Sequence, residues 1–128
     1  MKATPINPAI LLTPAGPYAQ GIKIEAPTQW FVSTGQVAIT ADGSIVEGAT
    51  EQSELVWKHL QALLSDAGMT LANVVKTNVY AVSADVLAAH NKVRNSVLGD
   101  CKPATTAVIV SGLANPKYLI EVDLIACR

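Results

Sequence analysis

The chain has 128 residues, of which 50% are hydrophobic, 15% charged and 5% aromatic, and its formal net charge is −1. This length predicts a single domain spanning residues 1–128. Nucleic-acid-binding proteins rely on basic surfaces and aromatic stacking platforms, so the composition argues against a nucleic-acid partner. The surplus of apolar residues favours an oligomer, because a small domain cannot bury that much apolar surface alone.

The sequence shows no sign of a membrane, metal or cofactor site. No segment approaches the ~20 apolar residues that span a bilayer, and residues 1–8 lack the apolar core of a signal peptide. Cys101 and Cys127 lie far apart, and His59 and His90 complete no metal-ligand spacing. Phosphate-binding glycine loops are absent. We therefore expect a cytoplasmic protein with reduced cysteines, no metal and no cofactor.

The first third of the chain predicts strands and turns. Four prolines in residues 1–20 exclude a helix there. A strand at 19–24 is expected to form a hairpin with a strand at 30–34. Gly35 follows at once and indicates a bulge or a close backbone approach. A short strand at 37–40 then leads to the turn signal Asp42-Gly43.

The middle of the chain predicts two helices around a strand. Thr50 is placed to cap a helix of about 17 residues that ends at Gly68, because apolar residues recur there at helical spacing. A strand follows at 74–81. Ser83 is expected to cap a second helix over 84–98, which ends at Gly99.

Two further strands are predicted at 103–110 and 119–126. Side chains alternate along a strand, so the second strand carries Glu121 on a largely apolar ribbon. The order of elements predicts an α+β fold with two helices on one face of a mixed sheet. By this pattern the other face is too apolar for water, and we expect other subunits to cover it.

Several motifs carry a family pattern, and they stand in one order over nearly the whole chain: Gly16-Pro17-Tyr18-Ala19-Gln20-Gly21, Ser33-Thr34-Gly35-Gln36, Val75-Lys76-Thr77-Asn78-Val79-Tyr80, Asn91, Pro103-Ala104-Thr105 and Ile120-Glu121-Val122-Asp123-Leu124-Ile125-Ala126. The sequence thereby resembles the RidA/YjgF (L-PSP) family. The resemblance implies a chorismate-mutase-like fold, a homotrimer and a small-molecule site in each intersubunit cleft. In its best-studied branch the activity is hydrolysis of reactive imines or enamines to keto acids and ammonia.

The resemblance also implies roles for individual residues. Glu121 would orient the attacking water, Tyr18 would close one wall, the Gly35 backbone would bond the ligand, and Asn91 would line the cleft. Each has a plainer alternative: a solvated or lysine-paired carboxylate, a packing tyrosine, a bulge, and an amide that ties down a loop. His90 shares an apolar helical stripe and is expected to be a packed histidine.

The chain departs from the family where the substrate would be held. Thr105 stands where that branch has an arginine that binds the substrate carboxylate. Replacing the arginine by threonine would lower the free energy of carboxylate binding by roughly 1.5 to 3 kcal/mol. Ala107 replaces a frequent cysteine. Arg94 replaces a usual aromatic and shares a helix face with Asn91, so it could supply the missing cation. A solvated arginine or an intersubunit ion pair is the alternative, and Lys117 and Arg128 are weaker candidates.

Of three candidate functions, a nuclease or translation-associated protein fits worst, because the near-neutral charge provides no basic patch. Two functions remain. The first is a cofactor-free imine or enamine deaminase that is poor on standard 2-imino acids because of Thr105. The second is a non-catalytic trimer that binds or senses a metabolite.

Overall fold

The computed structural model describes residues 1–128. Its two central strands, β4 (Val74–Ala81) and β6 (Ile120–Cys127), form from segments in which apolar residues alternate. On β6, every second residue from Ile120 to Ala126 is fully buried and the residues between them are half-exposed; Cys127 at the end of the strand is buried too. The predicted alternation is therefore confirmed, and it places Glu121 on the face turned away from the core.

The main sheet has the order β3-β6-β4-β5. Strand β3 (Trp30–Val32) runs antiparallel to β6, which runs antiparallel to β4. Strand β5 (Ala104–Ile109) is parallel to β4, because the helix between them returns the chain to the same end of the sheet.

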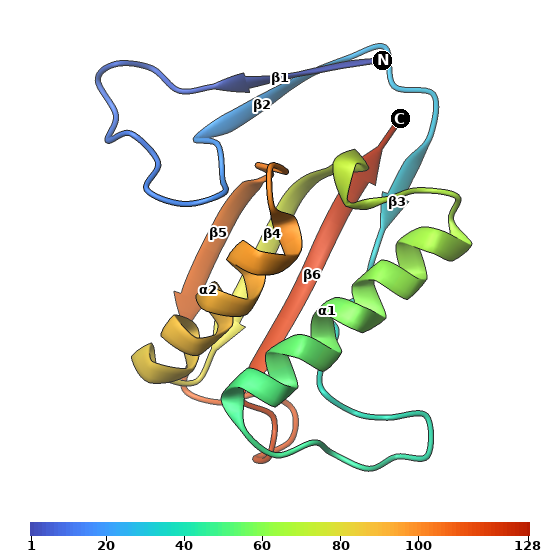
Figure 1. The fold of residues 1–128 in the computed structure, drawn as a ribbon, viewed down its shortest axis with the longest axis vertical. Coiled ribbons are helices and arrows are strands. Elements are labelled where there is room, and N and C mark those ends of the chain that lie inside the picture. Colours follow the sequence, from blue (N-terminus) through green and yellow to red (C-terminus); the bar gives the residue numbers. More distant parts are fainter.

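Two helices, α1 (Ala49–Asp66) and α2 (Ala84–Leu98), pack on one face of this sheet (Figure 1). The Ser83 side chain accepts a hydrogen bond from Val86 N at 3.2 Å, and Gly99 ends α2 with φ 53°, as predicted. Gly68, with φ 69°, follows the end of α1 as predicted. The α+β fold with two helices on a mixed sheet is confirmed.

The start of α1 differs from the prediction. Its N-cap is Gly48, with φ 94°, so Thr50 already lies inside the helix and caps nothing. A Cβ on Gly48 would lie 2.9 Å from Cδ of Glu51, whose carboxylate folds back over the glycine. The negative charge in the first turn therefore takes the place of a capping side chain.

The predicted hairpin between residues 19–24 and 30–34 is wrong. Strand β2 (Gly21–Glu25) pairs instead with β1 (Lys2–Ile6), and the two form a separate ribbon at one end of the main sheet (Figure 1). The backbone N–H groups of Thr28 and Gln29 both donate to the carbonyl of Arg128, at 2.7 and 2.9 Å. These bonds draw the chain toward the end of β6, where β3 finds its partner.

Residues 37–40 do not form a strand. A single bridge joins Ile39 to Ile45, and Thr40 N donates to the Ser44 carbonyl at 2.8 Å around the predicted Asp42-Gly43 turn. One short 3₁₀ turn, η1 (Leu71–Asn73), leads into β4.

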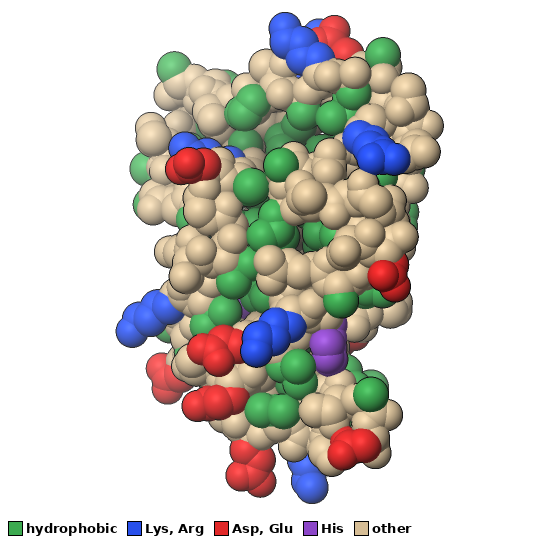
Figure 2. Space-filling model, turned by 45° about the vertical axis from the view of Figure 1, so that its right-hand side comes forward, with side chains coloured by type: hydrophobic (Ala, Val, Ile, Leu, Met, Phe, Trp, Pro, Cys, Tyr) green, Lys and Arg blue, Asp and Glu red, His purple; other side chains and the backbone are tan.

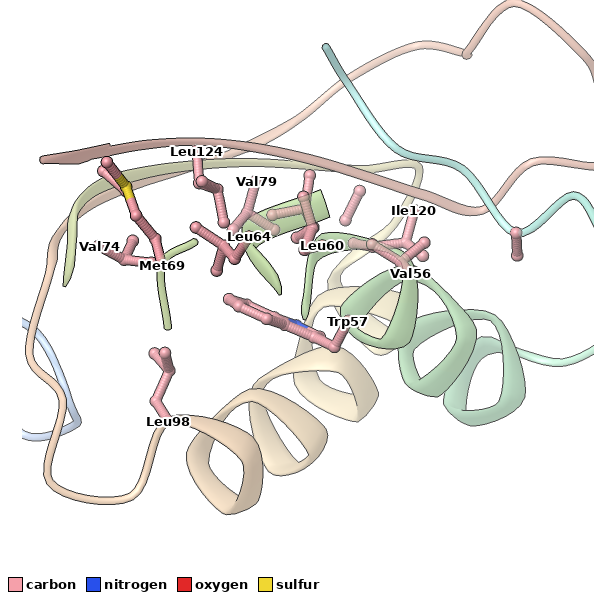
Figure 3. Close-up of a cluster of buried hydrophobic side chains, with 14 of the residues drawn as sticks. Val56, Trp57, Leu60, Leu64, Met69, Val74, Val79, Leu98, Ile120 and Leu124 are labelled. Atoms are coloured by element: carbon pink, nitrogen blue, oxygen red, sulfur yellow. The ribbon is translucent and has the colours of Figure 1, made fainter. Parts of the chain in front are cut away.

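Trp57 on α1 is the largest side chain of the core between the helices and the sheet (Figure 3). Its Nε1 donates to Nε2 of His90 on α2 at 3.1 Å, and both residues are fully buried. Burial lowers the pKa of His90 to about 4, which keeps the ring neutral and able to accept. The prediction of a packed histidine is confirmed.

The sheet face opposite the helices is more polar than expected. Its centre carries Asn78 and Tyr80 from β4 beside Asp123 and Glu121 from β6, in direct register. Apolar side chains lie toward its margins: Trp30 is 55% exposed and Val32 is 69% exposed. The interpretation of this face as too apolar for water is therefore wrong at its centre, because alternation places the polar residues of both strands on this one side.

The surface carries charges of both signs. Figure 2 shows acidic and basic side chains interspersed on the face it displays, with no extended patch of one sign. Neither helix is long and apolar enough to cross a membrane.

Candidate functional site

Glu121 and Gly35 lie directly against each other. Gln36 and Val122 exchange two backbone hydrogen bonds of 2.8 and 3.1 Å, which hold the segment after β3 alongside β6. A Cβ on Gly35 would lie 2.9 Å from Cδ and 3.0 Å from Cγ of Glu121. Only a glycine therefore leaves room for this carboxylate, and the close approach predicted at Gly35 is what the structure shows.

The carboxylate of Glu121 is half-buried and has no ion-pair partner. The one ion pair of the chain joins Lys23 and Glu25 at 3.1 Å on the exposed ribbon. Lys76, the lysine on the same sheet face, instead donates to Thr106 Oγ1 at 2.6 Å. The lysine-paired alternative for Glu121 is not what the chain forms.

The neighbours of Glu121 on this face are polar and mostly engaged with each other. Asn78 Nδ2 donates to Asp123 Oδ1 at 2.8 Å. Tyr80 is the register partner of Glu121. The negative charge of Asp123 raises the pKa of the Tyr80 phenol, and desolvation and the charge of Glu121 add to this effect. The Glu121 carboxylate, by contrast, accepts no hydrogen bond from any group of the chain.

The hydroxyl of Thr105 is used within the chain. It donates to the carbonyl of Pro103 at 3.2 Å and lies 2.7 Å from Oγ1 of the fully buried Thr77. A hydroxyl has one proton, so Thr77 is the donor of the second bond. In the register of β4 and β5, Thr105 and Ala107 face the helix side of the sheet, and Ala107 is exposed.

The Gly16–Tyr18 turn runs along the start of β5. Tyr18 N donates to the Gly16 carbonyl at 2.8 Å, and Ala19 forms a parallel bridge with Ala104. Tyr18 is half-buried at this edge. The turn therefore places Tyr18 close to the strand that carries Thr105.

Arg94 on α2 reaches the same edge. Its side chain is only 7% exposed, and its Nη2 is 3.3 Å from where a Cβ on Gly16 would lie. Burial lowers the pKa of the guanidinium, against a smaller opposing effect of Tyr18. The alternative of a solvated surface arginine is wrong.

The other candidates take structural positions. Asn91 is half-buried, and its Oδ1 lies 3.4 Å from Nδ1 of His90, so its amide orients the histidine. Arg128 donates to Gln29 Oε1 at 2.7 Å and to the Gly68 carbonyl at 2.8 Å. Lys117 is exposed, near the start of α1.

The structure thus brings the predicted residues together in two groups. Glu121 and Gly35 form one on the open face, and Tyr18, Arg94 and Thr105 form the other at the β5 edge. Strand β4 lies between β6 and β5, and Glu121 and Thr105 point to opposite faces of the sheet. Of the predicted site residues, only the weaker candidate Lys117 lines a hollow of the single chain, at the start of α1 and away from both groups.

Two neighbours of these groups have no role that the sequence predicts. Tyr80 is the cross-strand partner of Glu121, and Gly16 leaves the space that Arg94 fills. Both residues belong to the family motifs, and this membership is the only sign in the sequence that they lie near the site. Their roles depend on strand register and on the packing of α2, which a single sequence does not give.

Comparison with known proteins gives consistent matches. The family model described as Endoribonuclease L-PSP matches residues 9–128. The chain is 37% identical over 126 residues to "Protein mmf1, mitochondrial" of Schizosaccharomyces pombe, covering 96% of this chain and 75% of that protein. It is 40% identical over 118 residues to a RutC family protein of Pyrococcus abyssi, covering 90% and 89%. The solved structure of the Rid-family protein YyfB from Yersinia pestis superposes with a TM-score of 0.89 at 29% identity, covering 100% of both chains.

Proposed function

The chain belongs to the endoribonuclease L-PSP family, together with the RutC and Rid proteins, and from this premise we propose that it binds a small metabolite and hydrolyses its imine or enamine group. The products are a carbonyl compound and ammonia. The observation that supports this proposal best is the unpaired, half-buried carboxylate of Glu121 against the bare backbone of Gly35.

Glu121 serves as the base and then the acid in this reaction. Its carboxylate takes a proton from water as the water oxygen bonds to the imine carbon and the C=N electron pair moves to nitrogen. The carboxyl group then returns the proton to that nitrogen. In the second step Glu121 takes the proton of the new hydroxyl group and passes it to the amino nitrogen as the C–N bond breaks, so the carbonyl forms, ammonia leaves, and one water is consumed for each imine.

The Gly35 backbone contributes a hydrogen-bond donor. Its N–H has no partner within the chain, whereas its neighbour Gln36 donates to the Val122 carbonyl at 2.8 Å. A free N–H beside the carboxylate can bond the ligand and fix it over Glu121. This is the role that the family resemblance gives to Gly35.

The site is completed between subunits of a homotrimer in this proposal. Glu121 and the Tyr18 edge lie on different parts of one chain, so a second copy must bring its β5 edge to the open face. The exposed apolar residues Trp30, Val32 and Val108 flank that face and suit a subunit contact. The chemistry requires no metal or cofactor.

A non-catalytic metabolite-binding trimer is the second candidate. It is favoured by Thr105, whose hydroxyl is bonded to Thr77 and Pro103 and therefore makes a poor anchor for a carboxylate. In that case the cleft would retain ligand affinity without turnover. A cytoplasmic location stays a prediction for both functions.

The test is ammonia release from freshly generated 2-iminopropanoate and 2-iminobutanoate. We expect Glu121→Gln to lose about 100-fold or more of the wild-type rate, the usual contribution of general acid–base catalysis. Asp123→Asn, two residues along the same strand face, is the matched control and should keep most of the rate. Equal rates in wild type and Glu121→Gln would refute the mechanism, and ligand binding without any ammonia release would favour the second candidate.

A further inference from the structure

A hollow of about 340 Å³ lies between the ribbon of β1 and β2 and the end of the main sheet at which β4 and β5 begin (Figure 1). Its walls are mostly apolar and come from segments far apart in the sequence. The ribbon contributes Ala3, Pro5 and Ile22, and β4 contributes the buried Val74 and Val75. A hollow of this size is at the lower end of the range for small-molecule sites, so it suits a compact ligand with an apolar body.

The segment between α2 and β5 adds charges of both signs to this hollow. Asp100 and Lys102 line it and are exposed, on either side of Cys101 in the sequence. The two charges do not pair with each other, because the one ion pair of the chain joins Lys23 and Glu25. An anion and a cation, both free to bind a ligand, therefore border one apolar hollow.

Asn73 adds a hydrogen-bond donor to the same wall. Its Oδ1 accepts from Thr70 N at 2.9 Å and closes the start of the turn η1. The carbonyl end of the amide is thereby used within the chain, which leaves the NH₂ end to donate into the hollow that Asn73 lines. Together with Lys102, this amide can hold a carboxylate, and Asp100 can hold an ammonium group.

We propose that this hollow binds an apolar α-amino acid as its zwitterion. The apolar side chain of the ligand lies against Val74 and Val75. Its carboxylate accepts from Lys102 and Asn73, and its ammonium group donates to Asp100. A fatty acid would place its carboxylate near Asp100 without an ammonium group between them, and an aliphatic amine would meet Lys102 in the same way, so either is disfavoured by like charge.

The hollow is separate from the sheet face on which Glu121 lies. It opens at the start of β4, whereas Glu121 pairs with Tyr80 near the other end of that strand. Gly35 and Thr105 do not line it either. The amino-acid site is therefore an addition to the proposed hydrolysis, and it stands or falls without it.

The test is calorimetric titration of the native assembly with L-leucine and with its two singly charged analogues, 4-methylpentanoate and 3-methylbutylamine. L-Leucine should bind at least about 10-fold more tightly than either analogue, because each analogue lacks one charge-assisted contact. L-Serine should bind about 10-fold more weakly than L-leucine, because it lacks the apolar side chain. Equal affinity of L-leucine and any of these three compounds would overturn the proposal.

Variants of the two exposed charges separate the two contacts. Lys102→Met should weaken L-leucine binding about 10-fold without weakening the binding of 3-methylbutylamine. Asp100→Asn should weaken L-leucine binding by a similar factor without weakening the binding of 4-methylpentanoate. Lys58→Met, at an exposed lysine on α1 outside the hollow, is the matched control and should bind as wild type does. Wild-type affinity for L-leucine in Lys102→Met or in Asp100→Asn would overturn the proposal.

The thiol of Cys101 reports where the ligand binds, in a measurement that uses wild type alone. Cys101 is half-buried on the wall of the hollow, whereas Cys127 is fully buried. L-Leucine at about ten times its Kd should slow the alkylation of Cys101 by iodoacetamide about 10-fold, as followed by peptide mass spectrometry. An unchanged alkylation rate in the presence of bound L-leucine would show that the amino acid binds elsewhere, and this result would overturn the proposal.

Discussion

Acidification should destabilise this protein through one buried residue, His90. In the folded chain its ring is neutral and accepts a hydrogen bond from Trp57 Nε1 at 3.1 Å. Desolvation, with a smaller effect of Arg94, lowers its pKa from 6.5 to about 4, against the opposing bond to Asn91. The unfolded chain therefore takes up a proton first, so the stabilisation is complete above pH 6.5 and is lost as the pH falls toward 4.

The size of this effect follows from the two pKa values. The difference between 6.5 and about 4 corresponds to about 3 kcal/mol in total, at 1.36 kcal/mol for each unit. About 2 kcal/mol of it is already lost at pH 5. Against a typical unfolding free energy of about 5 to 15 kcal/mol, such a loss is readily measured.

The assay is urea unfolding at pH 7 and pH 5, followed by tryptophan fluorescence at one protein concentration, because the midpoint of an oligomer would depend on concentration. The comparison is between wild type and His90→Gln, whose amide oxygen can still accept from Trp57. The half-buried His59 gives the control His59→Gln. Wild type and His59→Gln should lose about 2 kcal/mol more than His90→Gln. Equal losses in all three proteins would refute the reasoning.

Three further predictions concern single contacts. Gly35→Ala should displace the Glu121 carboxylate and lower ammonia release by about 100-fold, with little change in melting temperature. A fully active variant would contradict the close approach of Gly35 and Glu121. Gln52→Leu should cost about 2 to 4 kcal/mol in urea unfolding, since the buried amide bonds two carbonyls and one N–H; a loss below about 0.5 kcal/mol would show that water replaces it. Ser83→Ala should cost about 1 kcal/mol by the same measurement, and no change would mean that the cap is unimportant.

Local sequence signals predicted most of the fold correctly. Strand β4, strand β6 and helix α2 carry alternation, helical periodicity and end signals within their own residues. The hairpin failed because β3 has only three residues and its partner, β6, lies at the far end of the chain. Nothing in the residues around β3 encodes that choice, which tertiary packing makes.

The candidate site was predictable in part for the same reason. Alternation alone placed Glu121 on its face, and a glycine after a strand indicated a close approach. The burial of Arg94 and the internal bonds of Thr105 depend on how α2 and β5 meet the Gly16–Tyr18 turn. Helical spacing could show that Arg94 and Asn91 are neighbours, but not which of them is buried.

Strand β6 follows both β3 and β4 along the chain, yet it lies between them in the sheet. Until its eight residues are in place, β4 lacks its antiparallel neighbour and β3 has no partner at all. A partly folded chain in which β6 has not yet docked therefore exposes unpaired edges on β3 and β4, which are sites for aggregation. Deleting Ile120–Cys127 would remove a central strand of the sheet, so a variant without these residues is expected not to fold.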